Sequence, residues 1–70
     1  MYDPKQLDQL QTFLGWSNQD VVDKLKLLSV TVSDQTIANW RNGDTIPDAD
    51  KLAALATIFG VGIERFYPDK

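Results

Sequence analysis

A short helix in the middle of the chain is the feature that most constrains the fold. Ser33 is a good N-cap, because its hydroxyl can accept a hydrogen bond from an unpaired backbone N–H at the start of a helix. Ile37 and Trp40 have the spacing that places both side chains on one helix face, which favours core packing of Trp40 over stacking on a ligand. Gly43 supplies the backbone freedom that commonly ends a helix. The stretch therefore predicts a helix that buries one face and exposes the side chains of Asp34, Gln35, Thr36, Ala38, Asn39 and Asn42.

Composition restricts the kind of protein that the chain can be. Its 70 residues make one domain, residues 1–70, near the lower size limit for a core without disulfides or metals. The sequence has no Cys and no His, so thiolate metal sites and His general bases are excluded. It also lacks a Gly-rich phosphate loop and a recognisable nucleophile–base pair. We expect a non-enzymatic protein that holds no metal and no cofactor.

The hydrophobic content points to a folded domain outside the membrane. Apolar residues make up 43% of the sequence, which suits a packed core. No apolar run approaches the ~20 residues that span a bilayer, and no signal-peptide pattern opens the chain. We therefore expect a soluble, cytoplasmic protein with no membrane partner.

Helical patterns precede the central stretch. Asp3 and Pro4 are typical of a helix start, and Gly15 is suited to end that helix. A second helix is expected to begin at Ser17 or Asn18, both of which are good caps. The apolar stripes of these two helices are Leu7, Leu10 and Leu14 in the first, and Val21, Val22, Leu25 and Leu28 in the second.

Two further helices are predicted after the central stretch. Asp48 is the expected cap of a helix that ends at Gly60. A last short helix follows it and stops at Pro68. The buried side chains of the longer helix are expected to be Leu52, Leu55, Ala56 and Phe59. The short helix carries Ile63, Phe66 and Tyr67.

The run V-S-D-Q-T-I-A-N-W-R-N-G-D-T-I, together with I-P-D-A-D-K-L-A-A-L-A-T-I-F-G-V-G-I-E-R-F, resembles the helix-turn-helix family of lambda-repressor and Cro-like regulators. The resemblance implies an all-α, lambda-repressor-like fold of five short helices, with the central helix third in order as the recognition helix. It also implies a transcriptional regulator that places this helix in the major groove of operator DNA. Small single-domain members resemble phage or prophage switch proteins and bind as homodimers, for which Phe66 and Tyr67 are our candidate surface.

Two features depart from the family pattern. The spacing from Gln19, which matches the family's phosphate-contacting glutamine, to Gly43 is longer than usual. The extra residues either lengthen the second helix or widen the turn after it. Arg41 stands where the family has a glutamate that pairs with an arginine in the first helix, and the matching first-helix position here is Gln11. Arg41 is therefore expected either to hydrogen-bond Gln11 or to swing out toward phosphate or a protein partner.

The candidate DNA-binding residues follow from this resemblance and from side-chain chemistry. Gln35 and Asn39 share a helix face, and their amides can pair with adenine in a major groove. The alternative is that they are ordinary solvated helix residues, and the same alternative applies to the lysines. The full set of DNA-binding candidates is Gln19, Gln35, Thr36, Asn39 and Asn42, with possible phosphate contacts from Lys24, Lys26 and Arg41.

The charge balance supports an alternative partner. The net charge is −3, whereas a DNA-binding domain usually carries a basic surface. Asp34 suits a helix N-terminus but repels phosphate. The alternative function is an antirepressor or modulator that keeps the fold and binds a repressor protein through an acidic surface, for which the candidates are Asp20, Asp34, Asp44 and Asp48.

Overall fold

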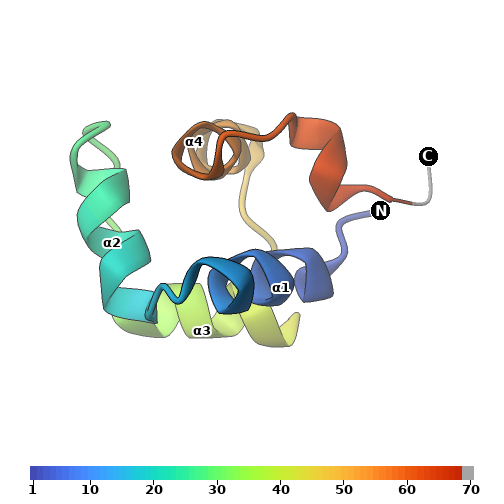
Figure 1. Ribbon diagram of the computed structural model, residues 1–70, viewed down its shortest axis with the longest axis horizontal. Coiled ribbons are helices and arrows are strands. Elements are labelled where there is room, and N and C mark those ends of the chain that lie inside the picture. Colours follow the sequence, from blue (N-terminus) through green and yellow to red (C-terminus); the bar gives the residue numbers. More distant parts are fainter. Residues whose placement is uncertain (69–70) are drawn as a thin grey trace.

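The computed structural model describes residues 1–68, which form four α-helices and one short 3-10 helix (Figure 1). In Figure 1, α1 lies alongside α3, and α2 stands at the left end of the molecule. α3 packs against both of these helices. The fourth helix lies across the opposite side of the core and packs against α2 and the 3-10 helix. The bounds are α1 Pro4–Leu14, α2 Asn18–Lys26, α3 Asp34–Asn42, α4 Ala49–Phe59 and η1 Ile63–Phe66.

The all-α prediction is confirmed, but the count of five α-helices is not. The expected last helix is the four-residue 3-10 helix η1. It ends at Tyr67, whose φ of −130° and ψ of 63° lie outside the helical region. Pro68 explains this, because a proline disfavours the helical conformation of the residue before it. No helix within residues 1–68 has the length and apolar character needed to cross a membrane.

The predicted caps form at the helix starts. The Ser33 hydroxyl accepts from the backbone N–H of Thr36, and the Asp48 carboxylate accepts from that of Lys51. Gly43 ends α3 in the left-handed region with φ 82°. A Cβ at this position would lie 3.2 Å from Cγ of Pro4, so glycine also permits the close approach of α3's end to the start of α1.

The core contains the predicted face of α3. Ile37 is fully buried and Trp40 is only 3% exposed. They pack in one cluster with leucines of α1, α2 and α4 and with Phe66 of η1. The backbone carbonyl of Trp40 also accepts a hydrogen bond from the Tyr2 hydroxyl at 3.1 Å, which ties the N-terminal segment to α3.

The N-terminal segment covers the 3-10 helix. The Tyr2 ring stacks on the Phe66 ring with a centroid separation of 6.3 Å, and the Asp3 N–H donates to the Phe66 carbonyl at 2.9 Å. Phe66 is consequently 0% exposed, and Tyr67 is half-buried. The prediction that Phe66 forms a dimer surface is therefore wrong, because the chain's own N-terminus already covers it.

Four residues assigned to buried stripes lie nearer the surface. Leu14 is 41% exposed and Leu28 is 42% exposed, while Val22 and Phe59 are half-buried. The reason for Leu28 is that α2 ends at Lys26, so Leu28 belongs to the turn and leaves the apolar stripe of the helix. Leu14 is the last residue of α1, at an end of the helix that the core covers only in part.

Candidate nucleic-acid interface

The connection between α2 and α3 is a wide turn that spans residues 27–33. Its first part folds back on the end of α2, where the Val30 N–H donates to the Leu25 carbonyl at 3.0 Å. Ser29 has a φ of 63°, an uncommon left-handed conformation for a residue other than glycine. The extra residues of this chain therefore widen the turn, and α2 itself remains nine residues long.

The outer face of α3 presents two linked amides. Gln35 is exposed and Asn39 is half-buried, and the Gln35 Nε2 donates to the Asn39 Oδ1 at 3.0 Å. This arrangement confirms that the two side chains share a face. Once linked, the pair still offers free N–H groups on Asn39 and a free carbonyl oxygen on Gln35. The face thus presents a donor and an acceptor side by side.

The other polar candidates differ in whether their side chains already form hydrogen bonds within the domain. The Thr36 hydroxyl lies 2.9 Å from the Ser33 hydroxyl and takes part in the cap of α3. Gln19 is exposed in the first turn of α2, and its Nε2 donates to the Asp23 Oδ1 at 2.9 Å. Asn42 is exposed in the last turn of α3, immediately before Gly43.

Arg41 is bonded to side chains of two other helices. Its Nε donates to the Asp8 Oδ1 at 3.0 Å, its Nη2 forms an ion pair with the same oxygen, and its Nη1 donates to the Asn18 Oδ1 at 2.7 Å. The expected bond to Gln11 is therefore wrong, because Arg41 bonds Asp8 and Asn18 instead, whereas its contact with phosphate or a protein partner stays a prediction. The guanidinium joins α3 to α1 and to the start of α2.

Gln11 is a buried member of the same hydrogen-bond network. It is 1% exposed, and its Nε2 donates to the Trp16 carbonyl at 3.2 Å and to the Asn18 Oδ1 at 3.1 Å. The Asn18 oxygen thus accepts from both Gln11 and Arg41. The Gln11 Oε1 is buried without a hydrogen-bond partner. Asp8 lies three residues before Gln11 on α1, so the two side chains share a helix face. This spacing could have pointed to Asp8 as the partner of Arg41 from the sequence.

The lysines of α2 are less available for phosphate contacts than the sequence suggested. The Lys24 Nζ lies 4.5 Å from the centre of the Trp16 ring, a cation–π contact on the side of α2 that faces α4. The Trp16 ring in turn stacks on Phe59 of α4 at 5.0 Å. Lys26 is exposed in the last turn of α2. Of the predicted phosphate contacts, Lys26 is thus the side chain most available to DNA.

The acidic candidates divide into caps and free carboxylates. Asp20 forms a reciprocal capping box with Ser17, and Asp48 caps α4. The backbone and side-chain hydrogen bonds from Lys51 hold the pKa of Asp48 below its usual value. Asp34 and Asp44 are both exposed, at the start of α3 and just past its end. They are the carboxylates that an approaching phosphate backbone or a protein partner would meet around α3.

A scan against protein-family models finds a match to the helix-turn-helix family over residues 14–66. The chain belongs to the Cro/C1-type helix-turn-helix family. Searches of curated proteins and of solved structures found no match. The family assignment makes this a DNA-binding helix-turn-helix domain of the kind that regulates transcription, and it confirms the resemblance seen in the sequence.

Within this helix-turn-helix protein, the matched region leaves out most of α1. It begins at Leu14, so Asp8 and Gln11 lie outside it, whereas Arg41 and Asn18 lie inside. The ion pair between α1 and α3 has the opposite polarity to the one that the resemblance implied, with the carboxylate on α1 and the guanidinium on α3. Arg41 therefore joins a partner outside the matched region, Asp8 of α1, to one inside it, Asn18 of α2.

Proposed function

We propose that the protein is a transcriptional regulator that binds operator DNA with α3 in the major groove, and that the linked Gln35–Asn39 pair reads the bases. The observation that carries this proposal is the uncovered donor–acceptor pair on the outer face of α3. Adenine displays an acceptor at N7 and a donor at N6 in the major groove. The free N–H groups of Asn39 match N7, and the free oxygen of Gln35 matches the N6 amino group.

Pre-pairing of the two amides favours this recognition. A Gln or Asn side chain that moves freely in solution must be ordered before it can make a two-pronged contact, and that ordering costs free energy. The hydrogen bond between Gln35 and Asn39 already restricts both side chains. Arg41, Asn18 and Asp8 support the same face from behind, because they hold α3 against α1 and α2.

The charge distribution implies that contacts with the bases provide an unusually large share of the DNA-binding affinity. Arg41 is engaged by Asp8, and Lys24 lies over Trp16, so few cations remain for phosphates. Non-specific binding comes almost entirely from phosphate neutralisation. We expect weak binding to random DNA and a large ratio between specific and random sequences.

The experiment is selection from a random duplex library, followed by anisotropy titrations with the selected site and with a scrambled duplex. Gln35→Ala and Asn39→Ala should each weaken specific binding by about 1–3 kcal/mol, the discrimination of a two-pronged base contact. Binding to the scrambled duplex should hardly change. Thr12→Ala, an exposed α1 substitution, is the control and should bind both duplexes as the parent does. Equal losses on both duplexes would contradict base reading by these residues.

The exposed carboxylates favour a second candidate function, a phage-type modulator that binds a basic repressor protein in place of DNA. Asp34 and Asp44 flank α3, and the net charge is −3. Replacing both with Asn separates the two functions. Phosphate repulsion is removed if DNA is the partner, so DNA binding should tighten, and more so at low salt. If the partner is a basic protein, its association should slow, because charge complementarity acts strongly on the encounter rate.

A further inference from the structure

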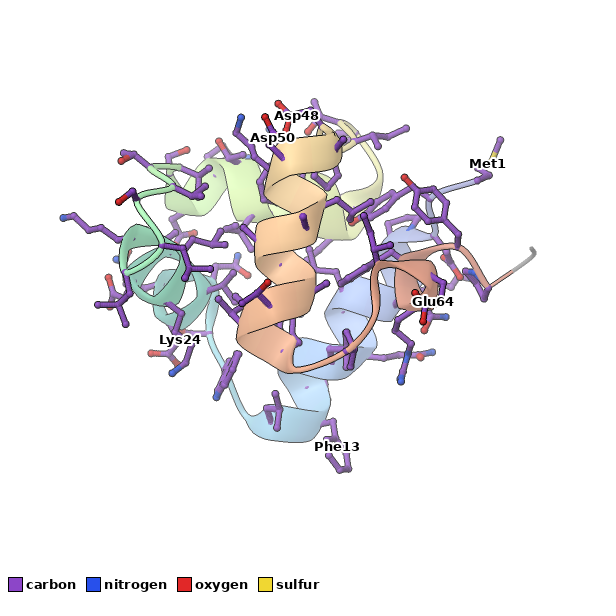
Figure 2. The ribbon with its side chains drawn as sticks, turned by 90° about the horizontal axis from the view of Figure 1, so that it is seen from above. Met1, Phe13, Lys24, Asp48, Asp50 and Glu64 are labelled. Atoms are coloured by element: carbon purple, nitrogen blue, oxygen red, sulfur yellow. The ribbon has the colours of Figure 1, made fainter. Side chains whose placement is uncertain are left out.

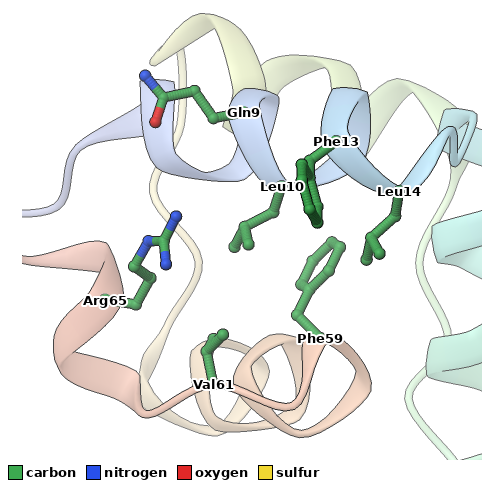
Figure 3. A pocket seen from close by; sticks show the side chains of 7 residues that line it. All are labelled: Gln9, Leu10, Phe13, Leu14, Phe59, Val61 and Arg65. Carbon is green, nitrogen blue, oxygen red and sulfur yellow. The ribbon is translucent and has the colours of Figure 1, made fainter.

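An apolar groove of about 520 Å³ runs between the C-terminal half of α1 and the end of α4 (Figure 3). Leu10 and Leu14 form its α1 wall, and Phe59 and Val61 form the opposite wall. Its volume falls within the range of about 300–1,000 Å³ that is usual for small-molecule sites. Figure 3 shows α3 on the far side of α1 from α4, so the groove is separate from the outer face of α3.

The two ends of this groove differ in polarity. Gln9 of α1 and Arg65 of η1 lie at one end, and they are the polar residues of the lining. Phe13, Leu14 and Phe59 gather at the other end. The Phe13 side chain is 86% exposed, and Figure 2 shows it at the end of α1, pointing away from the body of the molecule. This arrangement suits an amphiphile whose apolar tail lies on the aromatic rings and whose head group lies beside Arg65.

Arg65 determines the charge that the head group must carry. Its Nε donates to the Gln6 Oε1 at 3.1 Å, which orients the guanidinium, and no side chain among residues 1–68 bonds either Nη group. The lining contains no Asp or Glu, and the neighbouring Glu64 carboxylate lies against Gly62 instead. The Gln9 amide can donate a further hydrogen bond. A guanidinium presents parallel N–H groups that match the two oxygens of a carboxylate, so this end of the groove favours an anionic head group.

We propose that the groove binds an unbranched aliphatic carboxylate. The chain lies along Leu10, Val61 and the phenylalanine rings, and the carboxylate pairs with the Arg65 guanidinium. One guanidinium matches the single charge of a carboxylate better than the nearly double charge of a phosphate monoester. Burial of the chain drives binding, because each methylene removed from water adds to the affinity. Since Leu14 on the rim is itself 41% exposed, the groove is shallow, and we expect a Kd of about 1 mM for decanoate.

The test follows the amide resonances of ¹⁵N-labelled protein during titration with sodium decanoate below its micelle concentration. Saturable shifts should appear at the groove residues, and acetate, which has the head group without the tail, should cause none at the same concentration. Decyltrimethylammonium has the same tail with a cationic head and should bind about tenfold more weakly, because it lacks the charge-assisted pair. Decanoate shifts that stay linear up to micelle formation would overturn the proposal. So would equally tight binding of the cationic amphiphile, or tighter binding of decyl phosphate.

Matched variants test the two ends of the site separately. Arg65→Gln should weaken decanoate binding about tenfold, whereas Lys26→Gln removes the same charge from an exposed position on α2 and should leave the Kd unchanged. Phe13→Ala should also weaken binding, because it removes apolar surface from the groove. Leu27→Ala is its control, since that side chain is 85% exposed at the end of α2, away from the groove.

Circular dichroism should show the same helix content in all four variants, because these side chains lie outside the core. Decanoate binding by the Arg65→Gln variant as tight as the parent's would overturn the proposal, and so would equal weakening by Lys26→Gln. No DNA is used, so the outcome is independent of the proposed operator binding.

Discussion

Replacing Trp40 with alanine should remove most of the domain's stability. Trp40 is 3% exposed and sits where α3 meets the N-terminal segment and the central cluster. Truncating a buried aromatic to alanine costs about 3–5 kcal/mol. A folded chain of 70 residues has a total stability of roughly 4–10 kcal/mol, at ~0.05–0.15 kcal/mol per residue. The substitution thus costs a large fraction of the whole.

The expected shift is large enough for a simple melt. For a domain of this size, each 1 kcal/mol corresponds to about 4–8 °C, so Trp40→Ala should lower the Tm by at least about 12 °C or leave the chain unfolded. Far-UV circular dichroism is the appropriate signal, because the variant loses one of the two tryptophans that fluoresce. Phe13→Ala, measured at low concentration, is the control. Its ring is 86% exposed, so its Tm should stay within about 2 °C of the parent's.

Trp40→Phe keeps most of the buried ring and should recover much of the lost stability. If Trp40→Ala melted within a few degrees of the parent protein, the assigned core face of α3 would be wrong. The opposite face, which carries Gln35 and Asn39, would then no longer be the exposed one.

Three further predictions follow from the ion-pair network and the charges. Arg41→Met should destabilise the domain by about 1–2 kcal/mol, because it removes a charged hydrogen bond that partial exposure to solvent weakens. The double change Asp8→Arg with Arg41→Asp should recover part of this free energy in a chemical denaturation series. No recovery would contradict a pairwise contact. The logarithm of the DNA-binding constant should fall with log salt at a slope of only about −1, since Lys26 is the predicted phosphate contact that remains most available. A slope steeper than about −5 would refute this. Burial raises the pKa of Tyr2 above its ordinary value of 10.0, so the folded state favours the protonated phenol. Its contribution to stability is complete below pH 10 and declines as the pH rises further, and a Tyr2→Phe variant should lack this part of the alkaline decline in urea titrations.

The helices and their caps were predictable because their signals are local. Ser33, Asp48 and Gly43 act on backbone groups within a few residues, so their sequence neighbours decide the outcome. The buried face of α3 was predictable for the same reason, since the spacing of Ile37 and Trp40 is a property of one helix.

Contacts between distant segments were not predictable from such patterns. Arg41 and Asp8 are 33 residues apart, and their pairing depends on how α1 and α3 cross. The burial of Phe66 depends on Tyr2, at the other end of the described chain. The place of the extra residues was likewise left open, because the sequence of the turn does not show that Ser29 adopts a left-handed conformation that ends α2 early.

The proposed reading of bases by the linked amides of α3 can be observed directly by NMR on ¹⁵N-labelled protein. The side-chain NH₂ resonances of Gln35 and Asn39 are followed during titration with the selected duplex and with its scrambled counterpart. We expect large shifts of both pairs, with slowed hydrogen exchange, on the selected duplex alone. Unchanged side-chain resonances at saturation, or the same shifts with the scrambled duplex, would contradict it.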